Sequence, residues 1–482
     1  MPIPTTELPS FIAAYPEILM AVSALALLML GVFRTKDSTT LVTWIIVVVM
    51  AVAAGLAIRG THDFQTFNHL FVINGFTIFA KVLTLLGAGL TLLLINDWAH
   101  DEKIARFELP ILVLFATLGM MLMISANDLI SLYVGLELQS LSLYVLAAFH
   151  RDSQRATEAG VKYFVLGALA SGLLLYGSSL VYGFAGTTNF DGLAAAVKSG
   201  PNTIGIIVGV VFVIAGLAFK VSAVPFHMWT PDVYEGAPTP ITAFFSIAPK
   251  IAGLCLFLRV LVGPFAAMIE QWQQVIILIS ILSMAWGSIA AIAQKSIKRL
   301  MAYSSIGHVG YALIGLVVGN EEGARGLLFY LLVYLFMNVG TFAVILSMRV
   351  KGKYVEQISD LAGLSKNNPG VAMALAVLMF SMAGIPPMAG FLGKFYIFVA
   401  AVNAGFVTLA IVGLLASVVG AYYYLRLIKI MYFDEPAEAF DPPGLTTGII
   451  MAVSSVLMLV FFIVPAPLVN GAEAAAKALF LG

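Results

Sequence analysis

The 482-residue chain has the composition of an integral membrane protein. Hydrophobic residues make up 61% of it and charged residues 10%, whereas a soluble domain carries about a quarter charged residues. The 25 Lys and Arg residues balance the 25 Asp and Glu residues, so net charge gives no indication of nucleic acid or of a strongly charged partner. The composition therefore excludes an ordinary soluble domain.

Apolar segments long enough to cross a bilayer, about 20 residues each, recur along the whole chain. Hydropathy predicts an all-α polytopic membrane protein with about fourteen spans and shows no evident strand. The predicted spans are 11–33, 40–59, 73–95, 107–125, 127–149, 161–185, 203–222 continuing to 236, 239–263, 273–293, 300–319, 326–348, 370–403 with an interruption, 405–431 and 446–466.

Lys and Arg residues are divided unevenly between the two sets of loops. Loops after even-numbered spans hold three of them, Arg59, Lys198 and Arg325. Loops after odd-numbered spans hold sixteen: Arg34, Lys36, Lys103, Arg106, Arg151, Arg155, Lys162, Lys295, Lys298, Arg299, Arg349, Lys351, Lys353, Lys366, Arg426 and Lys429. Because cytoplasmic loops are enriched in Lys and Arg, we expect the second set in the cytoplasm and both termini on the opposite side.

Two spans contain residues that interrupt a helix. Pro225 lies in the seventh span, within AFKVSAVPFHMWTPD, and Pro386 and Pro387 lie in the twelfth, within MAGIPPMAGFLGKF. A proline removes a backbone hydrogen bond and clashes with the preceding turn. The two breaks are five spans apart, so their spans run in opposite directions, as in an inverted repeat that works at its broken helices.

This symmetry predicts four parts of the chain. They are spans 1–3 (residues 1–106), a first repeat of spans 4–8 (107–265), a second, inverted repeat of spans 9–13 (266–432) and the C-terminal span 14 (433–482).

One carboxylate lies near the middle of a span. An ionisable side chain at bilayer depth costs at least about 2.5 kcal/mol, so each one requires a reason. Glu137 is in the fifth span, and Tyr133, Ser140 and Tyr144 share its helical face. This pattern predicts a carboxylate that handles protons, or alternatively a member of a structural ion pair.

Three lysines also lie inside spans. Lys220 and Lys394 are beside the two breaks, and Lys250 follows Pro249 in the eighth span. A lysine beside a loosened turn can reach water, and a charge that moves nearby can switch its protonation. We expect these lysines to relay protons; static ion pairing is the alternative.

His308 is predicted to bridge a gap between the lysines. It shares a face of the tenth span with Ser304 and Ser305. Imidazole titrates near neutrality and can both accept and donate. Hydrogen-bonded packing is the alternative interpretation.

Five other polar residues have structural interpretations. We expect His227 to brace the seventh-span break, and Asp232 and Glu235 to lie near the cytoplasmic interface. Lys81 and Arg259 lie closer to span ends, where snorkelling or helix–helix bonding accounts for them.

The sequence gives no sign of a redox cofactor or metal. The single cysteine, Cys255, excludes an internal disulfide and cannot supply the four ligands of an iron–sulfur cluster. The loop histidines His62, His69, His100 and His150 lack metal-ligand spacing. Residues 1–10 contain no Lys or Arg, so the positive region of a signal peptide is missing and we expect the first span to be retained.

Four segments resemble the signatures of the antiporter-like membrane subunits of respiratory complex I. They are FKVSAVPFHMWTPDVYEGAPTP, AFFSIAPK, AYSSIGHVGY and GIPPMAGFLGKFYIF. The resemblance extends over spans four to thirteen, and YEGAPTP and the residues around Lys250 are similar to the subunit N branch, the counterpart of mitochondrial subunit 2. Subunit M typically has Glu where Lys394 stands.

The resemblance implies a function and roles for individual residues. Glu137, Lys220, Lys250 and Lys394 match the family's buried Glu and Lys positions. The implied function is proton translocation, as a non-redox subunit of the translocase NADH-quinone oxidoreductase in the bacterial inner membrane, with both termini in the periplasm. Implied partners are subunit M on one side, the small subunits K and J on the other, and lipids. NADH, FMN, iron–sulfur clusters and quinone are then expected in other subunits.

Two other functions are compatible with parts of the sequence. A subunit of an Mrp-type cation/proton antiporter shares the fold and the broken helices, and sodium dependence distinguishes it. A quinone-reducing redox subunit is disfavoured because the chain has no ligand set for a cluster or haem.

Overall fold

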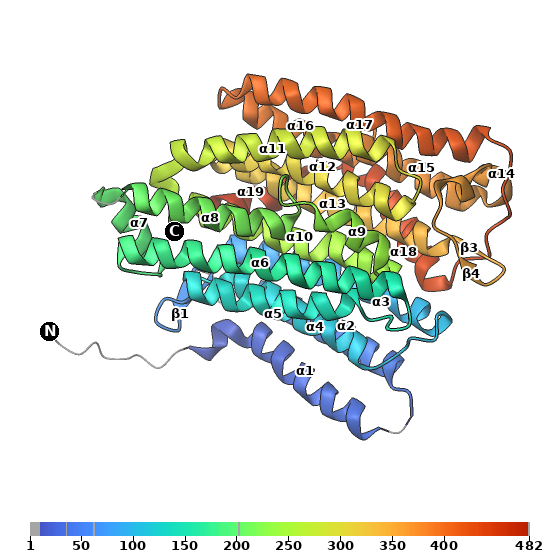
Figure 1. Ribbon diagram of the computed structural model, residues 1–482, viewed down its shortest axis with the longest axis horizontal. Coiled ribbons are helices and arrows are strands. Elements are labelled where there is room, and N and C mark those ends of the chain that lie inside the picture. The colour runs from blue at the N-terminus through green and yellow to red at the C-terminus, as the bar shows by residue number, and fades with distance from the viewer. Residues whose placement is uncertain (1–9, 35, 61–62, 201–202, 481–482) are drawn as a thin grey trace.

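The computed structural model describes residues 10–34, 36–60, 63–200 and 203–480. The N-terminal residues 1–9 and His62 lie outside the described part of the chain. Most helices run roughly along the long axis of the molecule (Figure 1).

The first half of the chain contains the first break, which lies between α8 and α9. They are η1 (Phe11–Ala14), α1 (Tyr15–Phe33), α2 (Thr39–Arg59), α3 (Gly75–Asp101), α4 (Glu108–Ser125), α5 (Leu129–Ala147), α6 (Gln154–Ala185), α7 (Phe190–Ser199), α8 (Thr203–Val221), α9 (Trp229–Gly236) and α10 (Thr239–Val262).

The second half of the chain contains the other break, which lies between α15 and α16. They are η2 (Ala266–Met268), α11 (Ile269–Ile292), α12 (Ile297–Val318), α13 (Glu321–Ser347), η3 (Ile358–Leu361), α14 (Leu364–Asn367), α15 (Pro369–Ala383), α16 (Ala389–Asn403), α17 (Val407–Phe433), α18 (Leu445–Ile463) and α19 (Ala466–Phe480).

The predicted spans and both interruptions are confirmed. Thirteen helices of the described residues are long and apolar enough to cross a membrane. The shorter apolar helices α15 and α16 together supply the interrupted twelfth span. The seventh span divides into α8 and α9. No finding tests the division into inverted repeats, which stays a prediction.

The expectation that the chain has no strand is wrong. Two antiparallel hairpins join spans, β1 (Phe64–Thr66) with β2 (Phe71–Ile73) and β3 (Arg349–Val350) with β4 (Lys353–Tyr354). Strands of two or three residues are too short to show the alternation by which a strand is recognised in sequence.

Two helices of ten or more residues were not predicted. α7 is a short helix between α6 and α8, and α19 follows the last span. The side-chain amide of Asn74, at the start of α3, donates to the Ala478 carbonyl at 3.3 Å and so holds the end of α19. Hydropathy windows miss such helices because they carry polar residues on one face and are shorter than a span.

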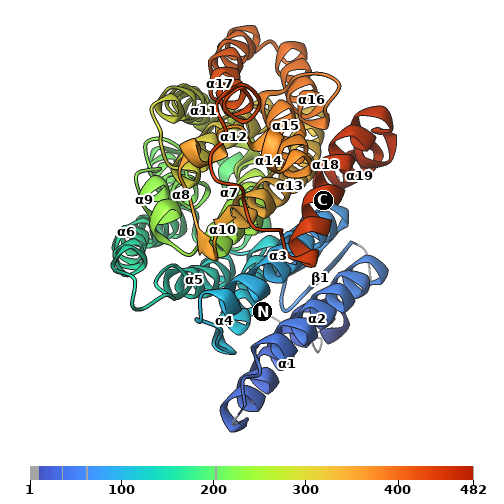
Figure 2. The ribbon, with the colours of Figure 1, turned by 90° about the vertical axis from the view of Figure 1, so that its right-hand side faces the viewer.

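The core lies around three helices that are buried on all sides. The apolar windows of α10 and α12 are entirely buried and that of α13 almost so. Figure 2 shows α1 and α2 at one edge of the bundle and α17 toward the opposite edge. Lys250 and His308 belong to α10 and α12, so these side chains have no direct route to lipid or water.

The bundle has two distinguishable ends. We call the end that carries the β3–β4 hairpin the hairpin end, and the end with α7 and β1 the α7 end (Figure 1). At the hairpin end, Arg349 pairs with Asp101 at 2.6 Å and with Asp441 at 3.2 Å. A hydrogen bond from the Gly352 backbone, together with Arg349, lowers the pKa of Asp441. These contacts tie the linker before α18 to α3.

Candidate functional site

Glu137 and Lys220 are brought together, with a hydroxyl between them. Glu137 on α5 is half-buried, and the Ser171 hydroxyl of α6 donates to its Oε1 at 2.5 Å. The Lys220 ammonium, in the last turn of α8, donates to Ser140 at 2.7 Å and lies 3.4 Å from both Ser171 and Tyr144. No direct Glu137–Lys220 ion pair occurs among the described residues; the Ser171 hydroxyl lies between the two side chains instead.

The Tyr144 side chain fits beside this cluster only because residue 167 is a glycine. A Cβ added at Gly167 would lie 2.1 Å from the Tyr144 hydroxyl. Tyr144 packs edge-on against Tyr163, with ring centroids 4.9 Å apart. The stripe predicted on the face of Glu137 therefore does face inward, toward α6 and α8.

The break after Lys220 is satisfied by side chains. Helix α8 ends at Val221, and Ser222 follows in the left-handed region with φ 67°. The freed Phe219 carbonyl accepts from the Trp229 indole at 3.0 Å, and the Val224 amide donates to Ser283 at 2.9 Å. The helix thus stops within one residue of the predicted segment 203–222, without leaving these groups unpaired.

Lys250 is buried in a wholly neutral setting. Its side chain is 1% exposed. The ammonium donates to Ser305, whose hydroxyl lies 2.8 Å from that of Tyr334, and it lies 5.3 Å from the ring centre of Tyr234. Among the described residues, no carboxylate forms an ion pair with Lys250, so the alternative of static ion pairing has no partner here.

His308 is held between two tyrosines. Its Nδ1 lies 2.5 Å from the Tyr330 hydroxyl and its Nε2 lies 3.0 Å from that of Tyr424. The Tyr424 hydroxyl is also 2.5 Å from Ser304. A neutral imidazole can donate through one nitrogen and accept through the other, so this arrangement can carry a proton in either direction.

Lys394 caps the end of the other broken helix. Its ammonium donates to the carbonyls of Met382 and Ala383, at 3.1 and 3.0 Å, and to Ser417 at 2.8 Å. Carbonyls at a helix C-terminus favour a positive charge. Lys394 also lines a cavity of about 390 Å³ between α16 and α17.

Pro386 and Pro387 lie in the short link between α15 and α16. Gly390 allows the halves to meet, because a Cβ there would lie 1.9 Å from the Ser381 carbonyl.

The predicted residues form three groups rather than one continuous chain. Lys250 and His308 are grouped because the serines in their surroundings are adjacent on α12: Lys250 donates to Ser305, and the Tyr424 hydroxyl beside His308 also contacts Ser304. Among the described residues, no hydrogen bond joins Ser304 to Ser305. Glu137 and Lys220 form a separate group, and Lys394 a third. Within the described residues, no hydrogen bond joins one group to another.

Sequence reasoning missed three tyrosines and two serines of these groups. Tyr330, Tyr334 and Tyr424 contact His308 or Ser305, Ser171 bridges the first group and Ser417 binds Lys394. Tyr330 and Tyr334 are four residues apart in an apolar span, so they form a polar stripe on one helical face. That spacing was the available signal.

Lys81 and Arg259 make helix–helix contacts, as expected. Lys81 pairs with buried Glu17 of α1 at 2.6 Å. Arg259 donates to the Ile124 carbonyl at 2.5 Å and to Asn127 at 3.1 Å. Both contacts join elements around the α7 end.

His227 and Cys255 complete the predicted residues. His227 is in the link between α8 and α9, with its ring centroid 6.0 Å from that of Trp286. Cys255 is a buried free cysteine. Among the described residues, no group of three or more His, Cys, Asp and Glu is arranged to hold a metal ion.

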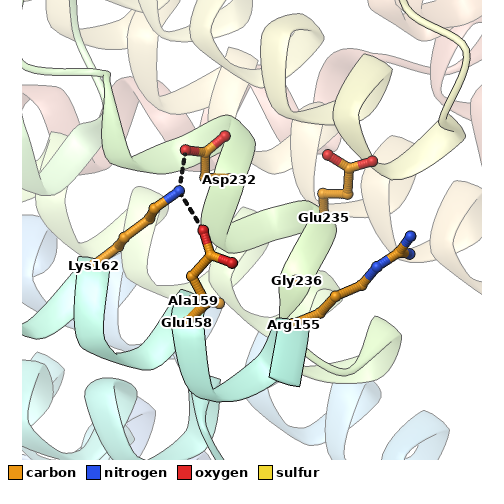
Figure 3. Close-up of a pocket in the computed structure, with 7 residues that line it drawn as sticks. All are labelled: Arg155, Glu158, Ala159, Lys162, Asp232, Glu235 and Gly236. Atoms are coloured by element: carbon orange, nitrogen blue, oxygen red, sulfur yellow. Dashed lines mark hydrogen bonds and ion pairs between the residues drawn. The ribbon is translucent and has the colours of Figure 1, made fainter. Parts of the chain in front are cut away.

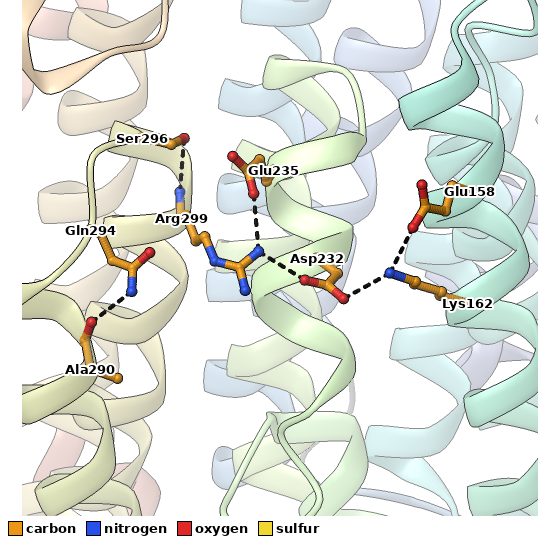
Figure 4. A network of polar contacts seen from close by, with 8 residues as sticks. All are labelled: Glu158, Lys162, Asp232, Glu235, Ala290, Gln294, Ser296 and Arg299. Carbon is orange, nitrogen blue, oxygen red and sulfur yellow. Dashed lines mark hydrogen bonds and ion pairs between the residues drawn. The ribbon is translucent and has the colours of Figure 1, made fainter.

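Asp232 and Glu235 lie at the hairpin end in a network of charges. The network runs from α6 through α9 to α12 (Figure 4). Beside it is a cavity of about 200 Å³ lined by Arg155, Glu158, Lys162, Asp232 and Glu235, among others. Figure 3 shows Lys162 between the carboxylates of Glu158 and Asp232.

Comparisons with known proteins place the chain in a family. The family model described as "NADH:quinone oxidoreductase/Mrp antiporter, TM" matches residues 126–420. NADH-quinone oxidoreductase subunit N of Rhodospirillum rubrum is 65% identical, over 97% of each chain. The subunit N of Paramagnetospirillum magneticum is 61% identical, over 96% of this chain and 97% of that protein.

Solved structures of related complexes have the same fold as this chain. A chain of respiratory complex I from Thermus thermophilus with bound aureothin matches with a TM-score of 0.81 at 32% identity, covering 95% of this chain and 99% of that one. A chain of the Mrp complex from Dietzia sp. matches with a TM-score of 0.86 at 23% identity, covering 98% of each. The Mrp similarity extends to the fold alone, whereas the relatives more than half identical are subunits N. The chain therefore belongs to the NADH:quinone oxidoreductase/Mrp antiporter family and, within it, to the NADH-quinone oxidoreductase subunit N group.

Proposed function

We propose that this subunit translocates protons through Glu137, Lys220, Lys250, His308 and Lys394, coupled to electron transfer from NADH to quinone in other subunits. In the first repeat, a proton passes between Lys220 and Glu137 through the Ser171 hydroxyl. The serine and tyrosine hydroxyls of α12, α13 and α17 pass protons between Lys250 and His308. Lys394 holds a proton at the second break.

The observation that carries this proposal is the setting of Lys250. Burying an ammonium without a counter-ion is costly, and the contacts of Lys250 are the hydroxyl of Ser305 and the face of Tyr234. A static structural lysine would be expected to have a carboxylate partner, as Lys81 has in Glu17. A lysine that gains and loses a proton is better served by neutral hydroxyls, which can donate or accept.

The wider setting is part of the same proposal. The subunit lies in the bacterial inner membrane with the hairpin end in the cytoplasm and both termini in the periplasm. Its neighbours are subunit M on one side and the small subunits K and J on the other. It binds no redox centre, so NADH, FMN, iron–sulfur clusters and quinone are held elsewhere in the complex.

The test is Lys250→Met in the assembled complex reconstituted into vesicles. We expect fewer protons per electron, because the side chain keeps its length but loses its titratable group. Cys255→Ala, in the same buried helix, is the matched control and should pump normally. Normal pumping by assembled Lys250→Met complex would refute the relay.

A further inference from the structure

Helix α9 is held in place mainly by its side chains. It has eight residues, and non-helical links separate it from α8, which ends at Val221, and from α10, which begins at Thr239. Continuous backbone hydrogen bonding therefore does not align it with either neighbour. Its position depends on contacts with α6 and α12 (Figure 4).

The outer face of α9 carries an ion-pair clamp. Asp232 accepts from Lys162 of α6 through Oδ2 at 2.9 Å and from Arg299 of α12 through Oδ1 at 2.8 Å. The same Arg299 nitrogen donates to Glu235 at 3.0 Å. Asp232 thus joins helices that lie in different predicted repeats. The four side chains are about one-third exposed, and partly hydrated ion pairs break and re-form readily.

The C-terminal end of α9 is anchored more firmly. Lys298, only 3% exposed, donates to the Ala237 carbonyl at 2.9 Å and to Glu356 at 2.9 Å. Gly236 packs directly on α6, since a Cβ there would lie 2.6 Å from the Arg155 carbonyl. The helix can therefore turn about this end when the clamp at Asp232 opens.

The inner face of α9 contacts the surroundings of two lysines. Tyr234 is fully buried, and its ring centre is 5.3 Å from the Lys250 ammonium. Trp229, one turn earlier, bonds the carbonyl of Phe219, the residue before Lys220. A movement of α9 would therefore change the surroundings of Lys250 and of Lys220 at the same time.

We propose that Asp232 and Arg299 are positioning residues that hold α9 between α6 and α12 and thereby set the Lys220 and Lys250 surroundings for proton transfer. This inference rests on the relay proposed above. Opening of the clamp moves Tyr234 relative to Lys250 and Trp229 relative to Phe219. The two residues touch no transferred proton; they act through α9.

The test uses Asp232→Asn and Arg299→Gln in the assembled complex, with two measurements. Amide hydrogen exchange of residues 229–236 should become about threefold or more faster, because local opening costs less free energy. The number of protons pumped per electron should fall by about twofold or more. Arg299→Lys keeps the positive charge, so its exchange rate and its number of protons per electron should lie between those of Arg299→Gln and of the unaltered complex. Lys351→Gln removes an exposed ion pair with Glu438 at the same end and is the matched control.

Each outcome separates the two proposals. Unchanged exchange in Asp232→Asn and Arg299→Gln, or faster exchange with a normal proton-to-electron ratio, would overturn the role of the clamp. If Lys250→Met pumps normally, the relay itself fails. If either clamp variant does not assemble, Lys162→Gln removes the other contact of Asp232 and must show the same paired effect for the inference to stand.

Discussion

Ser171 gives the first group a switch that a contact ion pair would lack. A unit charge pair at about 4 Å and an effective dielectric near 20 is worth about 4 kcal/mol, and a hydroxyl between the charges reduces this by increasing their separation. The hydroxyl donates to Glu137 and lies within hydrogen-bonding distance of Lys220. Small movements of α6 therefore alter how strongly the two charges interact.

Glu137 and Lys220 should behave as one unit in a double-mutant cycle. We expect Glu137→Gln and Lys220→Met each to lower proton pumping, and the double variant to lose less than two independent losses would give, with a coupling of about 1 kcal/mol. Ser171→Ala should diminish this coupling. Additive losses in the assembled complex would show that the residues act separately.

Lys394 should require a group that releases its proton. Lys394→Ala removes the cap on the Met382 and Ala383 carbonyls, so we expect impaired pumping. Lys394→Arg keeps a positive charge and donors for those carbonyls but does not lose its proton readily. Pumping measured in vesicles should be impaired in both variants. A normal rate with Arg would identify Lys394 as a static cap.

At the scale of elements, the two breaks place their lysines differently. Lys220 belongs to the helix before its break, whereas Lys394 belongs to the helix after its break. Lys394 contacts the carbonyls that end α15, and Lys220 contacts hydroxyls of α5 and α6. Lys394 is therefore bound to the break itself, whereas Lys220 points away toward Glu137.

The junction of α15 and α16 should tolerate no side chain at Gly390. Gly390→Ala would place Cβ 1.9 Å from the Ser381 carbonyl, and such overpacking costs about 1–3 kcal/mol. We expect a lower unfolding temperature and less assembled complex. Gly370→Ala in the first turn of α15, where nothing lies within 4 Å, is the matched control. Equal thermal stability of the two variants would contradict the close packing.

At the scale of the molecule, both ends of the bundle contain exposed lysines that report orientation. Lys351 at the hairpin end is 80% exposed, and Lys198 of α7 is exposed at the other end. The native Cys255 is buried, so it should give little background to a thiol reagent.

Single cysteines at these positions should label from opposite sides. We expect Lys351→Cys to react with an impermeant reagent from the cytoplasm and Lys198→Cys from the periplasm, because the hairpin end carries the basic loops. Accessibility measured in right-side-out and inverted vesicles would decide this. Labelling of both from the same side would contradict the alternation of spans, and reversed sides would contradict the orientation.

The spans, the breaks and the buried charges were predictable from local features of the sequence. Apolar length specifies a helix that crosses a bilayer because every backbone group must be paired within it. The prolines at 225, 386 and 387 mark breaks because they cannot continue that pairing. A lysine or glutamate inside a span is conspicuous because it is costly. These properties belong to single segments, so their neighbours are not needed to recognise them.

Only the tertiary structure decided which side chains meet. Ser171 lies 34 residues from Glu137, and Tyr424 lies 116 residues from His308, so no local pattern relates them. The lack of a carboxylate partner for Lys250, the clamp on α9 and the capping of α15 by Lys394 likewise depend on how helices pack. Contacts between distant segments are determined by the packing of the whole bundle, whereas helix formation in a membrane is determined within each segment.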